Sequence, residues 1–282
     1  ELLVCECGRS YPIIDGVPVV VDLALEPDPE LSPEAAAALV ANLPDEAPFA
    51  QLLEHLSIYL DNHWGPRTDD NDLSAVIAKI AALDHARATV ELGCSAGRIV
   101  HELARTSDQV VGIELRLATL RRARRLLAGE PVPYAQRQLG RTYAPAIAHG
   151  VVTPNIQLVC GDALDPPLVP GSYDRVVALN LIDSVRSPRQ LLSVMDGLCA
   201  PGGELVITSP YAWQTSIVDE PLPFDTAQSL VRILETGDRL GNRYEIAESS
   251  ELPWTLRRDA RSSVTYRIHY VRARKVPRAG TV

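Results

Sequence analysis

The stretch Thr89-Val-Glu-Leu-Gly-Cys-Ser-Ala-Gly-Arg98 decides the fold, because a short apolar run ends there in a turn with two glycines. Residues 99–105 continue with a helical pattern, so the stretch predicts a strand, a tight turn and a helix. Gly93 and Gly97 allow a sharp turn and close approach of a ligand, since glycine carries no Cβ. The helix would direct its unpaired N–H groups at whatever lies on the turn. A purely structural turn and a ligand-binding turn both remain possible at this point.

The next apolar segment, Gln109-Val-Val-Gly-Ile-Glu114, ends in an acid. Glu114 lies about twenty residues beyond Gly93, the spacing at which nucleotide-binding α/β domains place an acid on the ribose hydroxyls. A carboxylate can accept hydrogen bonds from two adjacent hydroxyls at once. The glycine turn and the spaced acid together favour a nucleotide site over a structural turn.

Three further apolar segments continue the alternation of strands with mostly helical connections. They are 155–162, which ends in Gly-Asp, 173–180, which ends in Asn, and 204–209, which precedes Pro210-Tyr-Ala-Trp213. Apolar, β-branched strands in this rhythm predict a parallel sheet with helices on both faces. A ligand then lies beyond the carboxyl ends of the strands, where the following residues fall: Gly93, Glu114, Asp162, Asn180 and Tyr211.

The remaining segments complete a Rossmann-like α/β fold with a seven-stranded, mostly parallel sheet. Residues 252–257 and 263–272 predict two last strands joined by a short turn, and the second alternates as an antiparallel strand would. Residues 130–154 interrupt the rhythm, and their prolines and Gly150 bound what we expect to be a short helical piece. Residues 220–250 form a polar insertion with one helix at 226–234.

The first part of the chain predicts two short strands, at residues 2–4 and 16–22, followed by a linker. Ser32 is a good N-cap for a helix, and residues 49–60 predict a second helix. The segment Tyr59-Leu-Asp-Asn-His-Trp-Gly-Pro66 is expected to form a turn, either an edge plug or a lid over a ligand. Residues 73–83 predict a helix that leads into the glycine turn. We therefore divide the chain into a β element (1–25), a helical lead-in and lid (26–66) and the main domain (67–282).

Composition excludes several classes of protein. The formal net charge of −9 argues against a general nucleic-acid binder, which needs a basic face. Arginines cluster in segments 116–125 and 257–274, which leaves room for a local basic patch, and those of the first segment are expected to form a solvated face rather than a nucleic-acid site. No apolar run is long enough to span a bilayer. The five scattered cysteines do not form a disulfide framework, and we expect a cytoplasmic protein without membrane contact.

Five motifs, taken in order and spacing, resemble class I S-adenosylmethionine-dependent methyltransferases: Glu91-Leu-Gly-Cys-Ser-Ala-Gly97, Gly112-Ile-Glu114, Gly161-Asp-Ala163, the strand ending at Asn180 and Pro201-Gly-Gly-Glu-Leu205. The resemblance covers residue 90 to about residue 274 and implies S-adenosyl-L-methionine as cofactor. It implies that residues 93–97, Cys94 and Ser95 among them, hold the methionine portion. It places Glu114 on the ribose, Asp162 and Ala163 at the adenine edge, and Asn180 at the reacting end, and it counts Glu91 and Leu115 among the cofactor-binding residues. Nothing in the sequence predicts a lowered pKa for Cys94, so it is better read as a packing residue than as a reactive thiol.

A narrower resemblance points to the methyltransferase domain of ovothiol-biosynthesis enzymes, which methylate an imidazole nitrogen of a mercaptohistidine. It is carried by these segments: Tyr59-Leu-Asp-Asn-His-Trp-Gly65, 93–105, Ala178-Leu-Asn-Leu-Ile-Asp-Ser184, Leu205-Val-Ile-Thr-Ser-Pro-Tyr-Ala-Trp213 and Glu251-Leu-Pro-Trp254. The chain departs from that family at Glu114, where Asp is commoner, in the 130–154 insertion and in its first residues. These departures leave open the identity of the methyl acceptor, which is either a small molecule or a peptide.

The first residues resemble the second half of a zinc-ribbon-like module found in activators of methyltransferases and ahead of some methyltransferase domains. The matching pattern is a cysteine pair followed by Tyr11-Pro-Ile-Ile-Asp-Gly-Val-Pro18. A structural zinc needs four ligands, and only Cys5 and Cys7 are present. We expect a vestigial β element and no metal.

The implied reaction is in-line methyl transfer to a neutral nitrogen, for which alignment of the two substrates can supply most of the acceleration. Asp183, His63 or Tyr211 could take the released proton or orient the acceptor ring. Tyr59, Asn62, Trp64 and Trp213 could bind the acceptor, and each could instead serve packing. Two alternatives remain: an N- or O-methyltransferase for a peptide or another natural product, and a non-catalytic S-adenosylmethionine-binding partner protein.

Overall fold

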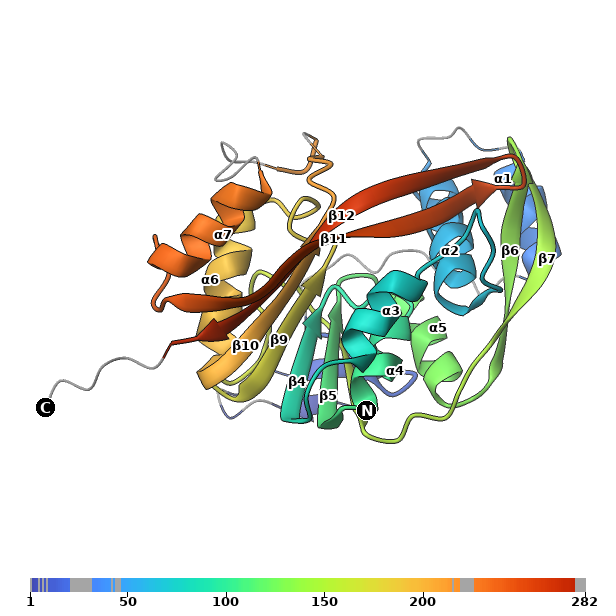
Figure 1. The fold of residues 1–282 in the computed structure, drawn as a ribbon. Helices are drawn as coiled ribbons and strands as arrows, with labels where there is room; N and C mark the ends of the chain where they lie inside the picture. The colour runs from blue at the N-terminus through green and yellow to red at the C-terminus, as the bar shows by residue number, and fades with distance from the viewer. Residues whose placement is uncertain are drawn as a thin grey trace, which may run out of the picture.

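A seven-stranded sheet forms the centre of the computed structural model (Figure 1), which describes residues 2–4, 6, 8, 10–20, 32–41, 43, 47–214, 216–218 and 226–276. Its order is β11 (Tyr244–Asp259), β12 (Ser262–Lys275), β10 (Cys199–Ser209), β9 (Tyr173–Leu179), β4 (Ala86–Leu92), β5 (Ser107–Glu114) and β8 (Ile156–Cys160). The strands from β10 to β8 are parallel, whereas β11 and β12 form an antiparallel hairpin. The predicted α/β class is confirmed.

Helices cover both faces of this sheet, as the sequence predicts. Consecutive residues of a strand point to opposite faces, and Val176 and Val177 of β9 accordingly belong to two separate buried clusters. One cluster includes α3 (Ser74–Ala81), α4 (Arg98–Ala104) and α5 (Leu117–Leu127), and the other includes α6 (Pro188–Leu198) and α7 (Ala227–Thr236). Within the described ranges, no helix combines the length and apolar character that a bilayer crossing requires.

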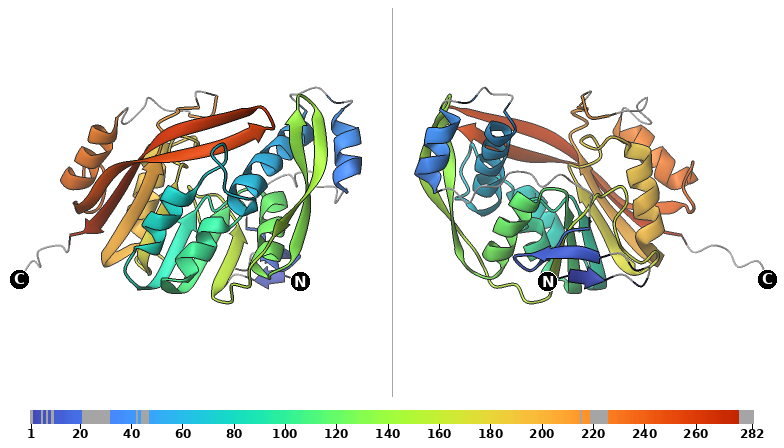
Figure 2. Two further views of the ribbon diagram at one scale, coloured as in Figure 1. Left: turned by 45° about the vertical axis from the view of Figure 1, so that its right-hand side comes forward. Right: turned by 180° about the vertical axis from the view of Figure 1, so that it is seen from behind.

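A second group of elements stands beside the sheet and is called the cap here. It consists of α1 (Pro33–Val40), α2 (Pro48–Trp64), β6 (Pro131–Leu139) and β7 (Thr142–His149). The predicted N-cap Ser32 accepts a hydrogen bond from the Ala35 amide at 3.2 Å. Strand β12 pairs with β10 only from His269 onwards, so the outer part of the β11–β12 hairpin projects past the sheet and reaches the cap (Figures 1 and 2).

Two predictions for the cap were wrong. Residues 131–149 form the β6–β7 hairpin and not a short helical piece. Their prolines suggested breaks, yet a two-stranded hairpin has only edge strands, on which proline is tolerated. Residues 59–64 are the last turns of α2 and not a separate turn. The helix continues because its apolar positions keep helical spacing and bury Leu56, Leu60 and Trp64.

The cap is tied to the hairpin by one buried carboxylate, Asp61 of α2, which is 2% exposed. Arg257 of β11 donates to both of its oxygens, at 2.8 Å and 2.9 Å. Tyr134 and Gln136 of β6 donate to Oδ1 at 3.1 Å and 2.7 Å. Asn71 donates to Oδ2 at 3.0 Å. A charge this well surrounded by donors fixes the relative positions of α2, β6 and β11.

The small N-terminal sheet comprises β1 (Leu2–Val4), β2 (Ser10–Ile14) and β3 (Val17–Pro18), of which β2 was not predicted. It extends the main sheet at its β8 edge, where the Val20 amide donates to the Cys160 carbonyl at 2.9 Å. Arg121 of α5 pairs with Asp15, so part of the arginine-rich helix holds this element. Cys5, Cys7 and the predicted linker at 23–31 lie outside the described residues.

Candidate functional site

A cavity of about 440 Å³ lies at the carboxyl ends of β4, β5, β8 and β9, between the sheet and α2. A volume of this size is ordinary for a small-molecule site. Its described walls include eight of the predicted cofactor residues: Glu91, Gly93, Ser95, Glu114, Leu115, Asp162, Ala163 and Asn180. The cavity is also lined by Tyr59 and His63 of α2 and by Trp254 of β11. Residues from both ends of the chain therefore meet at one site.

The turn after β4 is held in conformations that favour glycine. Gly93 and Gly97 have φ angles of 77° and 79°, and Ser95 between them has a φ of 48°. A Cβ at Gly93 would lie 2.9 Å from the Leu181 side chain, and one at Gly97 would lie 3.0 Å from that of Leu127. Gly93 thus keeps the floor of the cavity open, whereas Gly97 allows α4 to pack on α5.

Two buried acids stand on this floor. Burial and the neighbouring Glu114 raise the pKa of Glu91 well above its ordinary value. Oε2 of Glu91 has no hydrogen-bond partner among the described residues. Glu114 accepts hydrogen bonds from the Ser95 and Arg116 amides, each at 3.0 Å, and burial raises its pKa as well. A buried carboxylate without a partner is costly, so the floor is prepared for a cationic or hydrogen-bond-donating ligand.

The other predicted cofactor residues form the rim and the reacting end. Asp162 accepts from the Leu164 amide at 2.8 Å and from Arg186 at 3.1 Å. Leu115 is 44% exposed and offers a flat apolar surface near it. Asn180, at the end of β9, has a φ of 51°, and its side-chain oxygen accepts from the Thr208 hydroxyl at 2.8 Å. A non-glycine residue held in this conformation is typical of functional positions.

The side of the cavity facing α2 is aromatic and uncharged. His55, Tyr59 and His63 occupy one face of α2. The ring centroids of His55 and Tyr59 lie 4.5 Å apart, and those of Tyr59 and His63 lie 5.9 Å apart. Burial lowers the pKa of His55 to about 4 and that of His63 to about 3, with nearby arginines adding to the effect. Burial raises the pKa of Tyr59 to about 12. All three rings are therefore neutral at pH 7.

Four predicted site residues near the turn and α2 do not line the cavity. Cys94 is buried behind the turn, and burial raises the pKa of its thiol well above the ordinary value, which suits packing. Gly97 faces α5, as described above. Asn62 bonds to Asn71 and the Thr255 carbonyl, both at 2.9 Å, and accepts from the Trp254 indole at 3.2 Å. The Trp64 indole donates to the Ala96 carbonyl at 2.7 Å. Asn62 and Trp64 therefore hold other residues in place.

Asp183, Tyr211 and Trp213 also lie outside the cavity wall, just behind it. Asp183 accepts from the Ala212 amide at 2.8 Å, and its Oδ1 has no partner within the described part of the chain. The Tyr211 hydroxyl bonds to His269 at 2.8 Å. The Trp213 ring lies 6.2 Å from that of Tyr211. Tyr211 and Trp213 support the wall, whereas Asp183 keeps one buried oxygen without a described partner and is close enough to contribute to the raised pKa of Tyr59.

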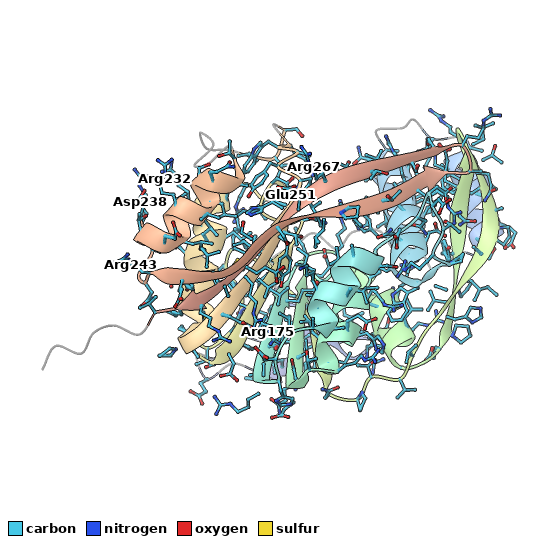
Figure 3. All side chains as sticks on the ribbon, in the orientation of Figure 1. Arg175, Arg232, Asp238, Arg243, Glu251 and Arg267 are labelled. Atoms are coloured by element: carbon cyan, nitrogen blue, oxygen red, sulfur yellow. The ribbon has the colours of Figure 1, made fainter. Side chains whose placement is uncertain are left out.

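Among the cavity residues that were missed from the sequence are two with aromatic rings, His55 and Trp254. The spacing of His55 to Tyr59 and His63, four residues at each step, could have revealed His55, since such residues share a helix face. Trp254 could not be placed without knowing that the hairpin crosses the cavity. In Figure 3, Glu251 and Arg267 mark the hairpin where it leaves the sheet, and Arg175 marks the opposite end of the sheet.

Comparisons with known proteins bear on the fold and on the class of protein. Residues 90–207 match the family described as "Methyltransferase domain". No curated protein matches the chain. The solved structure of the [4+2]-cyclase SpnF is 14% identical, with a TM-score of 0.51 over 80% of this chain and 94% of that one. A chain in the complex between the Haloferax volcanii Trm112 methyltransferase activator and its methyltransferase is 15% identical, with a TM-score of 0.51 over 86% and 97%. At these identities, the structures show a shared fold.

The residues of the cavity fit the cofactor that this family match indicates. The unpartnered oxygen of Glu91 suits an ammonium group, and the Glu114 carboxylate at the end of β5 suits a ribose diol. The rim at Asp162 and Leu115 suits an adenine ring. The match and the site together support a class I methyltransferase, and its cofactor is S-adenosyl-L-methionine.

Proposed function

We propose that the chain transfers a methyl group in line to a nitrogen of a small molecule, specifically an imidazole nitrogen of a histidine derivative. The observation that carries this proposal is the composition of the cavity at the carboxyl ends of the strands. Its floor suits the nucleotide cofactor, and its opposite side presents neutral aromatic groups, among them Tyr59 and Trp254. A flat, uncharged heteroaromatic ring matches that side, and the likeness of residues 59–65 and 251–254 to ovothiol-biosynthesis methyltransferases favours imidazole.

When bound, S-adenosylmethionine would supply an electrophilic methyl group to the acceptor nitrogen, with a neutral thioether as the leaving group. Tyr59 and Trp254 exclude water from the acceptor side of the cavity and direct the acceptor toward Asn180. Their ring faces also favour positive charge nearby. Asn62 keeps the Trp254 indole in position through its side-chain oxygen. Holding both reactants in line can supply most of the acceleration.

Methylation leaves one excess proton on the acceptor ring, and we assign its removal to Asp183. This carboxylate is 2% exposed, and burial raises its pKa, which makes it a better base than an ordinary aspartate. Oδ1 is the oxygen without a described partner. His63 was expected to share this role. With a pKa of about 3, it is too weak a base near neutral pH.

The test is a transfer assay with methyl-labelled S-adenosylmethionine and a panel of acceptors: histidine, mercaptohistidine, carnosine and histidine-containing peptides. We expect label on an imidazole nitrogen of a small acceptor, located by NMR of the product. Asp183→Asn should lower kcat while leaving cofactor affinity unchanged. Label only on a peptide or on oxygen would replace the acceptor assignment. Cofactor binding without transfer to any acceptor would favour a non-catalytic partner protein.

A further inference from the structure

Buried polar atoms without partners are concentrated at the cavity. Among the described residues, eight buried side-chain nitrogen and oxygen atoms have no hydrogen-bond partner, and four of them belong to cavity residues. These four are Nε2 of His55, Nδ1 of His63, Oε2 of Glu91 and Oγ of Ser95. Such atoms cost stability unless a ligand satisfies them. Glu91 and Ser95 lie on the cofactor floor, which leaves the two histidines to be explained.

His63 lines the cavity, and the chain around it lies beside the glycine turn. The next residue, Trp64, donates to the Ala96 carbonyl within that turn at 2.7 Å. Arg98, the first residue of α4, lies 3.5 Å from the His63 carbonyl. The turn carries the methionine end of the cofactor in the assignment above. His63, which is 8% exposed, therefore faces the amino-acid portion of the ligand from the α2 side.

The charges around His63 and Glu91 are of opposite sign. Burial is the main cause of the low pKa of His63, and the cations Arg67 and Arg98 lower it further. Arg67 donates to the Asn62 and His63 carbonyls, and Arg98 pairs with Glu102 at 2.6 Å, so both guanidinium groups are held in place. Their field favours an anion beside His63. The pKa values of Glu91 and Glu114 are both raised, and a cation on the floor would favour the ionised forms of these acids.

We propose that His63 is a cofactor-binding residue whose Nδ1–H donates to the carboxylate of the S-adenosylmethionine amino-acid tail. Glu91 receives the ammonium group of the same tail. The tail carries one group of each sign, and the site offers a matched partner for each. The inference rests on the cofactor assignment and is independent of the acceptor. It also gives α2 a role in closing the methionine end of the cavity.

The test compares two ligands that differ only in the carboxylate: S-adenosylhomocysteine and its decarboxylated form, S-adenosyl-3-thiopropylamine. Affinities are measured by calorimetry on the full chain. His63→Phe should weaken S-adenosylhomocysteine binding about 10- to 100-fold, the range for a hydrogen bond to a charged group. It should leave the decarboxylated ligand unchanged. His63→Asn, which keeps an N–H near the Nδ1 position, should restore part of the loss.

Equal weakening of both ligands by His63→Phe, or no weakening of either, would overturn the proposal. So would a wild-type protein that binds the two ligands equally tightly. If His63→Phe does not fold, ¹⁵N NMR of the histidine rings of the wild-type protein tests the proposal instead. The Nδ1 resonance of His63 should move with S-adenosylhomocysteine and stay in place with the decarboxylated ligand. Failure of methyl transfer to every imidazole acceptor would leave these binding results unaffected.

Discussion

Glu91 shows how one residue can favour ligand binding at the expense of the unliganded fold. Its side chain is 3% exposed, and one carboxylate oxygen has no partner within the described residues. Because burial and Glu114 raise its pKa above the ordinary 4.5, the folded protein holds its proton more tightly than the unfolded chain does. Unliganded stability is therefore lost as pH rises from that ordinary value through the raised one. An ammonium group beside Glu91 would reverse this cost.

We predict that Glu91→Gln raises the free energy of unfolding of the unliganded protein by about 1–3 kcal/mol at pH 8. At pH 4, where both forms are neutral, the difference should vanish. The same variant should bind S-adenosylhomocysteine more weakly, because the amide cannot pair with an ammonium group. Denaturant unfolding at the two pH values measures the first effect, with the exposed Glu235→Gln as control. A destabilised variant at pH 8 would contradict this explanation.

At the scale of elements, the position of α2 governs the site, and Asp61 governs the position of α2. The helix brings Tyr59 and His63 to the cavity, while the β11–β12 hairpin brings Trp254. Asp61 joins both elements to β6 through donors from Arg257, Tyr134 and Gln136. Removing one partner of a buried ion pair leaves an uncompensated charge, here that of Arg257.

Replacement of Asp61 by Ala is predicted to lower the free energy of unfolding by about 3–5 kcal/mol. The exposed Asp69→Ala, in the loop that follows α2, should change it by less than about 0.5 kcal/mol. Chemical denaturation of the full chain measures both values. A loss of under 1 kcal/mol for Asp61→Ala would mean that the cap is not held by this carboxylate.

The contacts between elements also explain which parts of the fold the sequence predicts and which parts it does not. Strands β4, β5 and β9 and the turn at 93–97 follow from local patterns, since buried parallel strands are continuous apolar runs and the turn needs glycine. The β6–β7 hairpin and the full length of α2 depend on contacts between distant segments. The prolines of residues 131–149 suggested breaks in regular structure, although proline is compatible with an edge strand. Asn62 and Trp64 were expected at the acceptor because polar and aromatic side chains there suit either recognition or packing, and only burial distinguishes the two.

In the whole molecule, one side of the cavity could be predicted from the sequence and the other could not. The first is the proposed cofactor side and the second is the proposed acceptor side. The cofactor side comes from the carboxyl ends of parallel strands, where the strand order reverses between β4 and β9. The acceptor side comes from α2 and the hairpin, which meet only in the folded protein. The division of the chain at residues 25 and 66 stays a prediction, as do the roles of Asp183 and Asn180.

The central claim is that the floor of this cavity binds S-adenosylmethionine, with Glu114 on the ribose. Calorimetric titration of the full chain with S-adenosylhomocysteine, alongside Glu114→Ala, tests it most directly. The exposed Glu130→Ala serves as the control. We predict one-site binding by the wild type and the control, and a loss of about 10- to 100-fold for Glu114→Ala, which lacks a carboxylate for the two hydroxyls. Equal affinity in all three proteins, or no binding by the wild type, would contradict the account.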